Sequence, residues 1–396
     1  MANAQDALNV QQYKDPAHGV DSTIGPQAIT QYYQKQALIE AAKEQFFGQL
    51  ASVTDMPKNM GKKIVRYVYL PLLDDENVND QGIDATGATI ANGNLYGSSK
   101  DVGTIVGKMP LLGENGGRVN RVGFRRKQIE GTFEKYGIFE EYTEESMNFD
   151  SDADLAQHIN REMINGANEI TEDLLQIDLL NSAGTVRYAG TAISNATIDA
   201  TSVVTYDDLM RLNIDLNNKR TPAGIKQITG SRMVDTRTLP GARVMYIGSE
   251  LIPTLRAMKD GHGDPAFIGT EKYASAGNTV NGEIGQVDQF RIVVVPEMMK
   301  WAGAGAAVTD TAFHNDGTRY DVFPMLVVGS ESFTTIGFQT DGKTTKFVIN
   351  SKKPGAETAD RHDPFGEMGF MSIKWYYGFM ALRPERIGLI KTAAML

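Results

Sequence analysis

Apolar residues recur at helical spacing over residues 151–180, and this is the clearest pattern in the chain. The members of the stripe are Leu155, Ile159, Met163, Ala167, Ile170, Leu174 and Ile177. Steps of three and four positions place them on one face of an α-helix. Asp150 or Ser151 can cap its start, and Gly184 is the expected stop. Such a helix is on the order of 45 Å long, which suits a structural beam.

Three further helices are predicted around it. Residues 27–50 carry apolar side chains at roughly helical spacing. Thr205 followed by Asp208 is a variant of the capping box, and it opens a helix with Leu209, Leu212 and Leu216 on one face. Ser249 is expected to cap a short helix that runs to about residue 258.

Strand-like runs rich in β-branched and aromatic residues occupy much of the remaining chain. They fall at residues 63–70, within 186–204, at 242–247, 291–295, 321–338, 344–350 and 370–384. Strands and helices alternate irregularly, and the strands lie far apart in sequence. The predicted fold class is therefore α+β.

Residues 82–131 form a stretch with eleven glycines and no apolar run that could fill a core. A compact domain seldom contains a segment of this length without secondary structure of its own. The ends of the stretch alternate like strands. We therefore predict an arm that folds against a neighbouring subunit, so that the product is an assembly.

Basic residues gather within this stretch, and acidic residues gather on either side of it. The basic set is Arg118, Arg121, Arg125, Arg126 and Lys127. The acidic sets are Asp74, Asp75 and Glu76 before it, and Glu140, Glu141, Glu144 and Glu145 after it. The basic set is either a nucleic-acid patch or an ion partner for the acids of another subunit. The second interpretation is favoured, because opposite charges fix the register of an interface and complementary runs lie close in the chain.

Composition narrows the class of protein. The chain has 396 residues, a formal net charge of −10 and no cysteine. Disulfides and thiolate metal sites are thereby excluded. An excess of acids disfavours general binding of nucleic acid, although such a chain can line a DNA-filled space. Neither a signal peptide nor an apolar run of about 18 residues is visible, so no membrane partner is expected.

Motifs for catalysis or cofactors are incomplete. Gly103 to Met109 resembles a phosphate loop but has one residue too few and lacks the Ser or Thr that holds magnesium. Asp150, Asp152 and Asp154 resemble the start of a calcium loop whose later ligands are missing. The five histidines lack zinc-site spacing. No catalytic, cofactor-binding or metal-binding residue is predicted.

The order of elements, from polar arm through glycine-rich loop and long helix to a terminal aromatic strand, resembles a known family. Short stretches at 256–261, 285–290 before Val293-Val294-Val295-Pro296, and 372–378 leading into Arg383-Pro384-Glu385 add to the likeness. The chain resembles the major capsid protein of tailed double-stranded-DNA phages, with the Hong Kong 97-type fold. The N-four-like short-tailed phages are the most similar group.

The resemblance implies a division of the chain into five segments. They are an N-terminal arm (1–55), an extended β-hairpin loop (56–135), a peripheral domain (136–200) with its spine helix at 151–182, an axial domain (201–345), and a return to the peripheral domain with a terminal strand (346–396).

The resemblance also implies a function and partners. The chain would form hexamers and pentamers of an icosahedral shell around phage double-stranded DNA, with only non-specific proximity to that DNA. A separate scaffolding protein, a portal and a decoration protein are its implied partners, and it would pass from the host cytoplasm into the virion. Two alternatives stay open: another virion part, such as a tail tube or sheath, and a soluble enzyme whose lid is the glycine-rich stretch.

Overall fold

The structure is a computed structural model of the chain. It describes residues 46–57, 59–71, 124–149, 155–228, 236–240, 243–273, 282–338, 347–355 and 361–396, together with the single residues 102, 280 and 359. Most of the predicted helix at 27–50 and most of the glycine-rich stretch therefore lie outside the described residues. The residues described at 48–50 form a short 3-10 helix, η3 (Gly48–Leu50).

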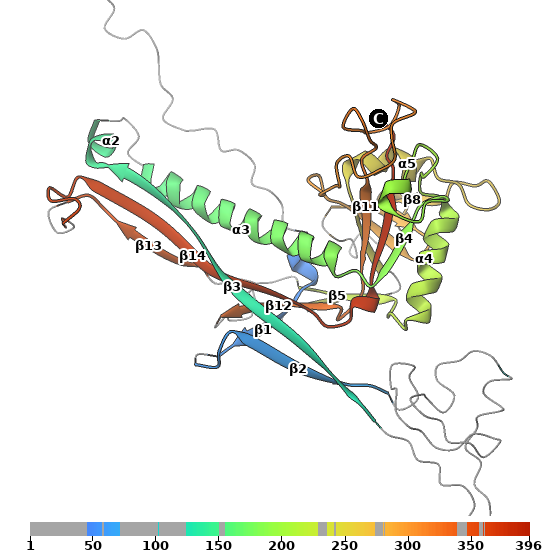
Figure 1. The fold of residues 1–396 in the computed structure, drawn as a ribbon, viewed down its shortest axis with the longest axis horizontal. Helices are drawn as coiled ribbons and strands as arrows, with labels where there is room; N and C mark the ends of the chain where they lie inside the picture. Colours follow the sequence, from blue (N-terminus) through green and yellow to red (C-terminus); the bar gives the residue numbers. More distant parts are fainter. Residues whose placement is uncertain are drawn as a thin grey trace, which may run out of the picture.

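Two large β-sheets organise the described residues, and the first of them is long and narrow (Figure 1). Its main path is β1-β12-β14-β3-β2, and β13 extends the β12 side of β14. The strands are β1 (Ser52–Met56), β2 (Lys63–Tyr69), β3 (Arg126–Thr143), β12 (Phe333–Phe338), β13 (Val348–Lys352) and β14 (Met368–Ala381). The predicted strands near 63–70 and 370–384 are confirmed.

Antiparallel pairing of β3 with β14 forms the backbone of this sheet. The register runs from Met368 opposite Thr143 to Phe379 opposite Thr132. Alternate residues of β14 point to the two faces of the sheet, as strand geometry requires. On one face, Met371, Ile373, Trp375 and Tyr377 are buried and join the main core. That face is covered by the long helix α3 (Leu155–Asn181) (Figure 1).

Helix α3 confirms the predicted beam, but its buried face differs from the predicted stripe. Met163 and Ala167 are buried as expected, whereas Ile170 and Ile177 are 38% and 42% exposed. In the second half of the helix the buried positions are Thr171, Glu172, Leu175, Gln176 and Leu179. The buried face turns because the helix changes neighbours along its length. Gln176, for example, donates from Nε2 to Met298 Sδ at 2.9 Å.

The second sheet has seven strands, in the order β4-β15-β11-β7-β10-β9-β8. They are β4 (Thr185–Tyr188), β7 (Arg243–Ile247), β8 (Phe267–Gly269), β9 (Glu283–Val287), β10 (Phe290–Val294), β11 (Phe323–Val328) and β15 (Ile387–Thr392). A separate hairpin joins β5 (Gly224–Ile228) to β6 (Thr236–Pro240). Every residue of β7 and β11 is buried. Continuous apolar runs of this kind fit a sheet covered on both faces.

Helix α4 (Tyr206–Asn218) begins at the predicted capping box. Thr205 Oγ1 accepts from the Asp208 backbone N–H, and Asp208 Oδ2 accepts from the Thr205 N–H. Leu209, Leu212 and Leu216 are fully buried against the second sheet. The prediction for Ser249 was wrong. Gly248 occupies the N-cap of η5 (Ser249–Leu251) without a side-chain cap, and α5 (Ile252–Arg256) follows.

Shorter elements complete the chain. They are α2 (Glu144–Phe149), η4 (Asn195–Thr197), η6 (Thr270–Lys272) and η9 (Pro384–Arg386). Gly184 lies three residues beyond the end of α3 and donates its N–H to Pro384 O at 2.9 Å. A Cβ at this position would lie 2.6 Å from the same oxygen, so the close approach of the two backbones requires glycine.

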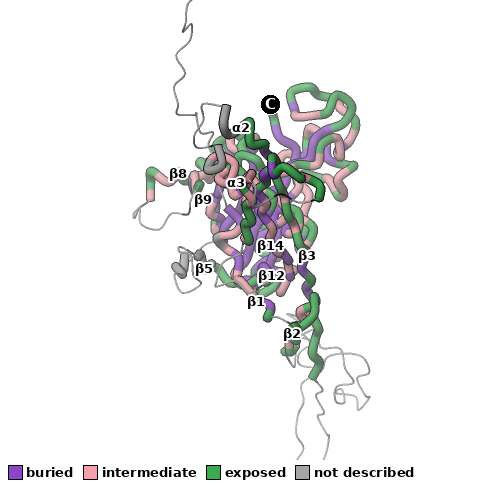
Figure 2. The backbone as a smooth tube through the Cα atoms, turned by 90° about the vertical axis from the view of Figure 1, so that its left-hand side faces the viewer, coloured by how far each residue is buried: buried purple, intermediate pink, exposed green. Residues whose placement is uncertain are grey.

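The main core connects the two sheets. It contains side chains from α3 and β14 together with Val244, Tyr246, Leu326 and Val328 of the second sheet. Buried residues accordingly concentrate in the body, while the outer parts of β2 and β3 are exposed (Figure 2). The sheets do not follow the five predicted segments throughout: β1 falls in the predicted arm, and β15 lies in the second sheet. The segment boundaries themselves stay a prediction.

Arg243 is buried at the junction of β7 with the end of α4. Its Nη2 donates to Asn217 Oδ1 and to Thr221 O, both at 2.7 Å, and its Nη1 donates to Asn213 Oδ1. Burial lowers its pKa, and the charge of Asp288 opposes that shift. The guanidinium therefore ties the second sheet to its covering helix through hydrogen bonds with neutral acceptors.

We expect Arg243→Leu to lower the free energy of unfolding by about 3 kcal/mol, because it leaves buried acceptors on α4 without a donor. Urea titration of the unassembled subunit measures this loss. Arg211→Leu is the matched control, since Arg211 forms an exposed pair with Asp207 on the same helix. Equal losses in the two variants would contradict a structural role for the buried guanidinium.

Candidate assembly surfaces

Strands β2 and β3 form a hairpin that projects from the body (Figure 1). Val65, Tyr67 and Tyr69 on β2 are 40%, 49% and 65% exposed, and Phe124 before β3 is 66% exposed. Strand β2 is also the last strand of its sheet, so one of its edges has no paired strand among the described residues. An exposed apolar edge strand is a natural site for pairing with another chain.

The described part of the basic set lies on this hairpin. Arg125 precedes β3, and Arg126 and Lys127 are its first residues. The Arg126 guanidinium carbon lies 4.6 Å from the centre of the Tyr67 ring, a cation–π contact that holds the side chain along β2. Arg118 and Arg121 lie outside the described residues, so three of the five predicted cations are placed.

The second acidic set lies at the opposite end of β3. Glu140 and Glu141 are near the end of the strand, and Glu144 and Glu145 form the first turn of α2. All four side chains are exposed, and we call them the acidic tip. Phe139 beside them is 68% exposed. Asp74, Asp75 and Glu76 lie outside the described residues.

The two charged sets are therefore carried by one strand and are held apart by it. Fifteen positions separate Arg126 from Glu141, and an extended chain spans about 50 Å over that interval. Side chains of ordinary length do not bridge this gap. Within one protomer the acidic tip and the described cations of the basic set, Arg125, Arg126 and Lys127, therefore do not form ion pairs with each other.

A second junction holds the first described residues against α3. The backbone N–H groups of Phe46 and Phe47 both donate to Glu172 Oε1 at 2.6 Å. The Tyr246 hydroxyl donates to Phe46 O at 3.0 Å, and the rings of Phe47 and Tyr246 lie 4.5 Å apart. Glu172 is 7% exposed. A carboxylate on the long helix thus fixes the place where the N-terminal segment enters the body.

Burial is the main electrostatic influence at this junction. It raises the pKa of Glu172, and the backbone N–H groups of Phe47 and Phe46 oppose that shift. Burial likewise raises the pKa of Asp178, whose Oδ2 accepts from the Tyr377 hydroxyl at 3.0 Å. The pKa of Tyr246 is raised well above its ordinary value by burial and then by the charge of Glu172.

Chemistry of other kinds finds little support in the described part of the chain. It contains no group of three or more His, Asp or Glu side chains that could hold a metal ion. None of the helices described has the length and apolar character needed to cross a bilayer. The exposed hairpin and the acidic tip are suited to contact between macromolecules, whereas the N-terminal junction is buried within the protomer.

Comparison with known proteins identifies the family of this chain. A family model described as phage capsid protein matches residues 126–392. The major capsid protein of Pseudomonas phage KPP21 is 68% identical over 395 residues, which cover 99% of this chain and 100% of that protein. The chain belongs to the family of phage capsid proteins.

Solved structures agree with this family at the level of the fold. The capsid of Ralstonia phage GP4 is 11% identical, with a TM-score of 0.57 over 94% of this chain and 98% of that chain. The capsid of cyanophage Pam1 is 13% identical, with a TM-score of 0.52 over the same shares. The predicted capsid protein with an α+β fold of the Hong Kong 97 type is confirmed. A member of this family is a structural component of the virion.

Sequence reasoning missed the junction at Glu172. The residue lies inside the helix that was predicted, but its spacing gives no sign of burial. One signal was available, because Glu172 is a carboxylate that lies among the apolar positions of a helix. A buried acid almost always has hydrogen-bond partners, so its position could have suggested a contact. Its partners, Phe46 and Phe47, are more than 120 positions away, so the sequence did not indicate which amides it binds.

The raised pKa of Glu172 predicts a dependence of stability on pH. The folded protein retains the proton above 4.5, the ordinary pKa, whereas the unfolded chain releases it there. The contribution of Glu172 to the free energy of unfolding is therefore complete below pH 4.5. It is lost as the pH rises through the pKa that Glu172 has in the folded protein. Glu172→Gln keeps an acceptor for the two N–H groups and should remove this part of the pH dependence.

Unfolding of the wild type and of Glu172→Gln, measured from pH 4 upward, checks the prediction. Glu162→Gln is the control, because Glu162 is an exposed acid on the same helix. It should retain the wild-type profile. A Glu172→Gln profile that parallels the wild type would show that this carboxyl does not titrate differently on folding.

Proposed function

We propose that this chain builds an icosahedral shell of hexamers and pentamers that encloses phage double-stranded DNA. The observation that carries the proposal is the projecting hairpin of β2 and β3, with its exposed aromatic side chains and its open strand edge. Docking of this hairpin on a second copy would bury that surface. Pairing along a free strand edge supplies main-chain hydrogen bonds between copies.

The charged residues at the two ends of β3 support contact between copies of this chain. Arg125, Arg126 and Lys127 lie at one end of β3 and the acidic tip at the other. Repetition of the chain would bring the basic set of one copy near acids of another. Such pairs set the register of an interface, while each exposed pair contributes only about 0–1 kcal/mol. Arg118, Arg121, Asp74, Asp75 and Glu76 belong to the same proposal.

The proposed role is structural and without catalysis. The five segments would act as arm, extended loop, peripheral domain, axial domain and return strand, with the axial domain meeting its copies at fivefold and sixfold centres. A separate scaffolding protein, a portal and a decoration protein are the proposed partners, and assembly would occur in the host cytoplasm. A net charge of −10 suits a surface that faces packaged DNA without adhering to it.

Electron microscopy and sedimentation of the purified chain test this function. Closed shells or rings of five and six subunits are the expected products. Tubes would favour a tail tube or sheath protein. Small globular oligomers under all assembly conditions would contradict the proposal.

We expect the double reversal Arg125→Glu and Arg126→Glu to impair assembly and to leave the fold of the subunit intact, because both residues lie on an exposed part of the hairpin. Light scattering follows assembly, and circular dichroism follows the fold. Lys259→Glu with Lys272→Glu is the matched control, since it changes the net charge by the same amount at exposed positions away from the hairpin. Normal shells from the hairpin variant would contradict the ion-pair proposal.

A further inference from the structure

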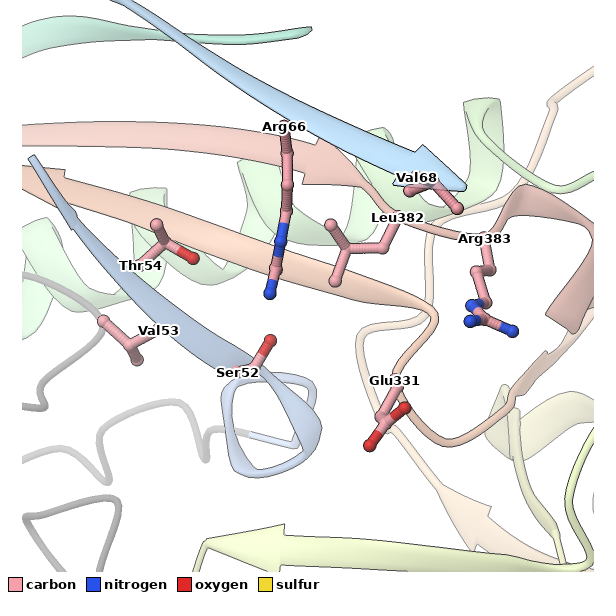
Figure 3. Close-up of a pocket in the computed structure, with 8 residues that line it drawn as sticks. All are labelled: Ser52, Val53, Thr54, Arg66, Val68, Glu331, Leu382 and Arg383. Atoms are coloured by element: carbon pink, nitrogen blue, oxygen red, sulfur yellow. The ribbon is translucent and has the colours of Figure 1, made fainter. Parts of the chain in front are cut away.

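Two adjoining cavities follow strand β2 where the hairpin meets the body. They have volumes of about 400 Å³ and 300 Å³ and share Val68, Leu382 and Arg383. In the first, Arg66 reaches from β2 toward Ser52 on β1, and Glu331 and Arg383 lie at the other end (Figure 3). The second is formed by the ends of β2 and α4, the start of β3 and the turn after β14.

The second cavity concentrates positive charge on an acidic protein. Its charged lining residues are Lys127, Lys219, Arg220, Arg383, Arg386 and a single carboxylate, Glu385. Burial and then the neighbouring charge of Arg383 lower the pKa of Arg386, and the charges of Glu331 and Glu385 oppose this shift. The two arginines are therefore close enough to repel each other. We call this lining the cationic groove. Such a cluster is stabilised by an anion that enters it.

Arg220 has a backbone conformation that sequence preference does not explain. It follows the C-terminal end of α4 with φ of 55°, in the left-handed region. Thr221 N–H donates to Leu216 O, and Arg220 N–H donates to Asn217 O, both at 2.9 Å. These two bonds form a Schellman motif, in which glycine is the favoured residue at this position. An arginine in a strained position points to a role for its side chain in the groove.

Four apolar side chains also line the groove, and we call them its floor. They are Val68, Leu70, Ile129 and Leu382, and they are partly buried. An occupant that fits both the floor and the cations of the groove combines carboxylates with an apolar side chain. The acidic tip has this composition, because exposed Phe139 lies next to its four glutamates. Cavities of this size admit a few side chains, whereas duplex DNA offers only a convex row of phosphates.

We propose that the cationic groove receives the acidic tip of a second copy of this chain, with Phe139 against the apolar floor. The tip of the same copy is excluded, because Lys127 and Glu141 lie 14 positions apart on one strand, or about 45 Å. This inference rests on the proposed assembly and deepens it. It assigns the receiving site to Lys219, Arg220, Arg383 and Arg386, none of which belongs to the basic set found from the sequence.

Arg220→Gly separates docking from folding. Glycine is favoured at this position, so the free energy of unfolding should be retained. The concentration of subunit needed to form shells should rise about threefold, because one charged contact per subunit is lost. If this variant forms shells at the same concentration as the wild type in the same assay, the proposed docking in the groove is wrong. The proposed function is unaffected by that result, because shells still form.

A charge exchange tests the pairing itself. Arg383→Glu and Glu141→Arg should each block assembly, and the two together in one chain should restore it, because every copy then carries a complementary groove and tip. Failure of the double variant, with both singles impaired and all subunits folded, overturns the assignment of the tip as occupant. If Arg220→Gly assembles normally but binds a short DNA duplex more weakly than the wild type, the groove is a nucleic-acid site. That result also contradicts docking of the acidic tip.

The absence of cysteine allows a direct measurement of the contact. A chain carrying Glu141→Cys and Lys219→Cys should form covalent ladders with a short bis-maleimide once shells have assembled. Glu141→Cys with Asp207→Cys is the control, since Asp207 lies at the other end of α4, and it should give no ladder. Equal ladders in the two chains, or ladders in neither, contradict docking of the tip in the groove.

Discussion

Antiparallel pairing of β3 with β14 is the interaction on which the other features of this capsid protein depend. Twelve consecutive residue pairs align the two strands, and α3 packs along one face of the ladder. The ladder holds the end of β3 that carries Glu141, and β2 pairs with the other end, where Arg126 lies. A shorter pairing would let β3 bend and bring its charges together. The two ladders of β3 therefore hold these charges far apart within one protomer.

Contacts between copies need to be weak one at a time for a closed shell to form without errors. The exposed ion pairs proposed here each contribute little, and ordering of the hairpin on docking opposes them. In the proposed assembly each subunit would make several such contacts, and their joint effect would grow through multivalency. The main core, in contrast, lies inside one protomer. It joins α3, β14 and the second sheet, and it supports the surfaces that carry the proposed contacts.

Local patterns in the sequence predicted the elements that depend on near neighbours. The box of Thr205 and Asp208 and the leucines of α4 were placed correctly, since three residues suffice to define a cap. Ile170 and Ile177 were misplaced because periodicity assumes one neighbour along a helix, and α3 has several. Glu172 and the cationic groove depend on segments that are distant in sequence. Lys127, Arg220 and Arg386 come together only through the topology of the sheets, which no local pattern encodes.

The distance in sequence between β3 and β14 also governs when the subunit becomes complete. The ribosome adds 225 residues between Thr143 and Met368, which takes about 10–50 seconds at the usual rates of translation. During that interval β3 lacks its central partner, and β1 lacks β12 as well. A nascent chain therefore lacks the turn after β14, which contributes Leu382, Arg383 and Arg386 to the cationic groove, until its synthesis has nearly ended.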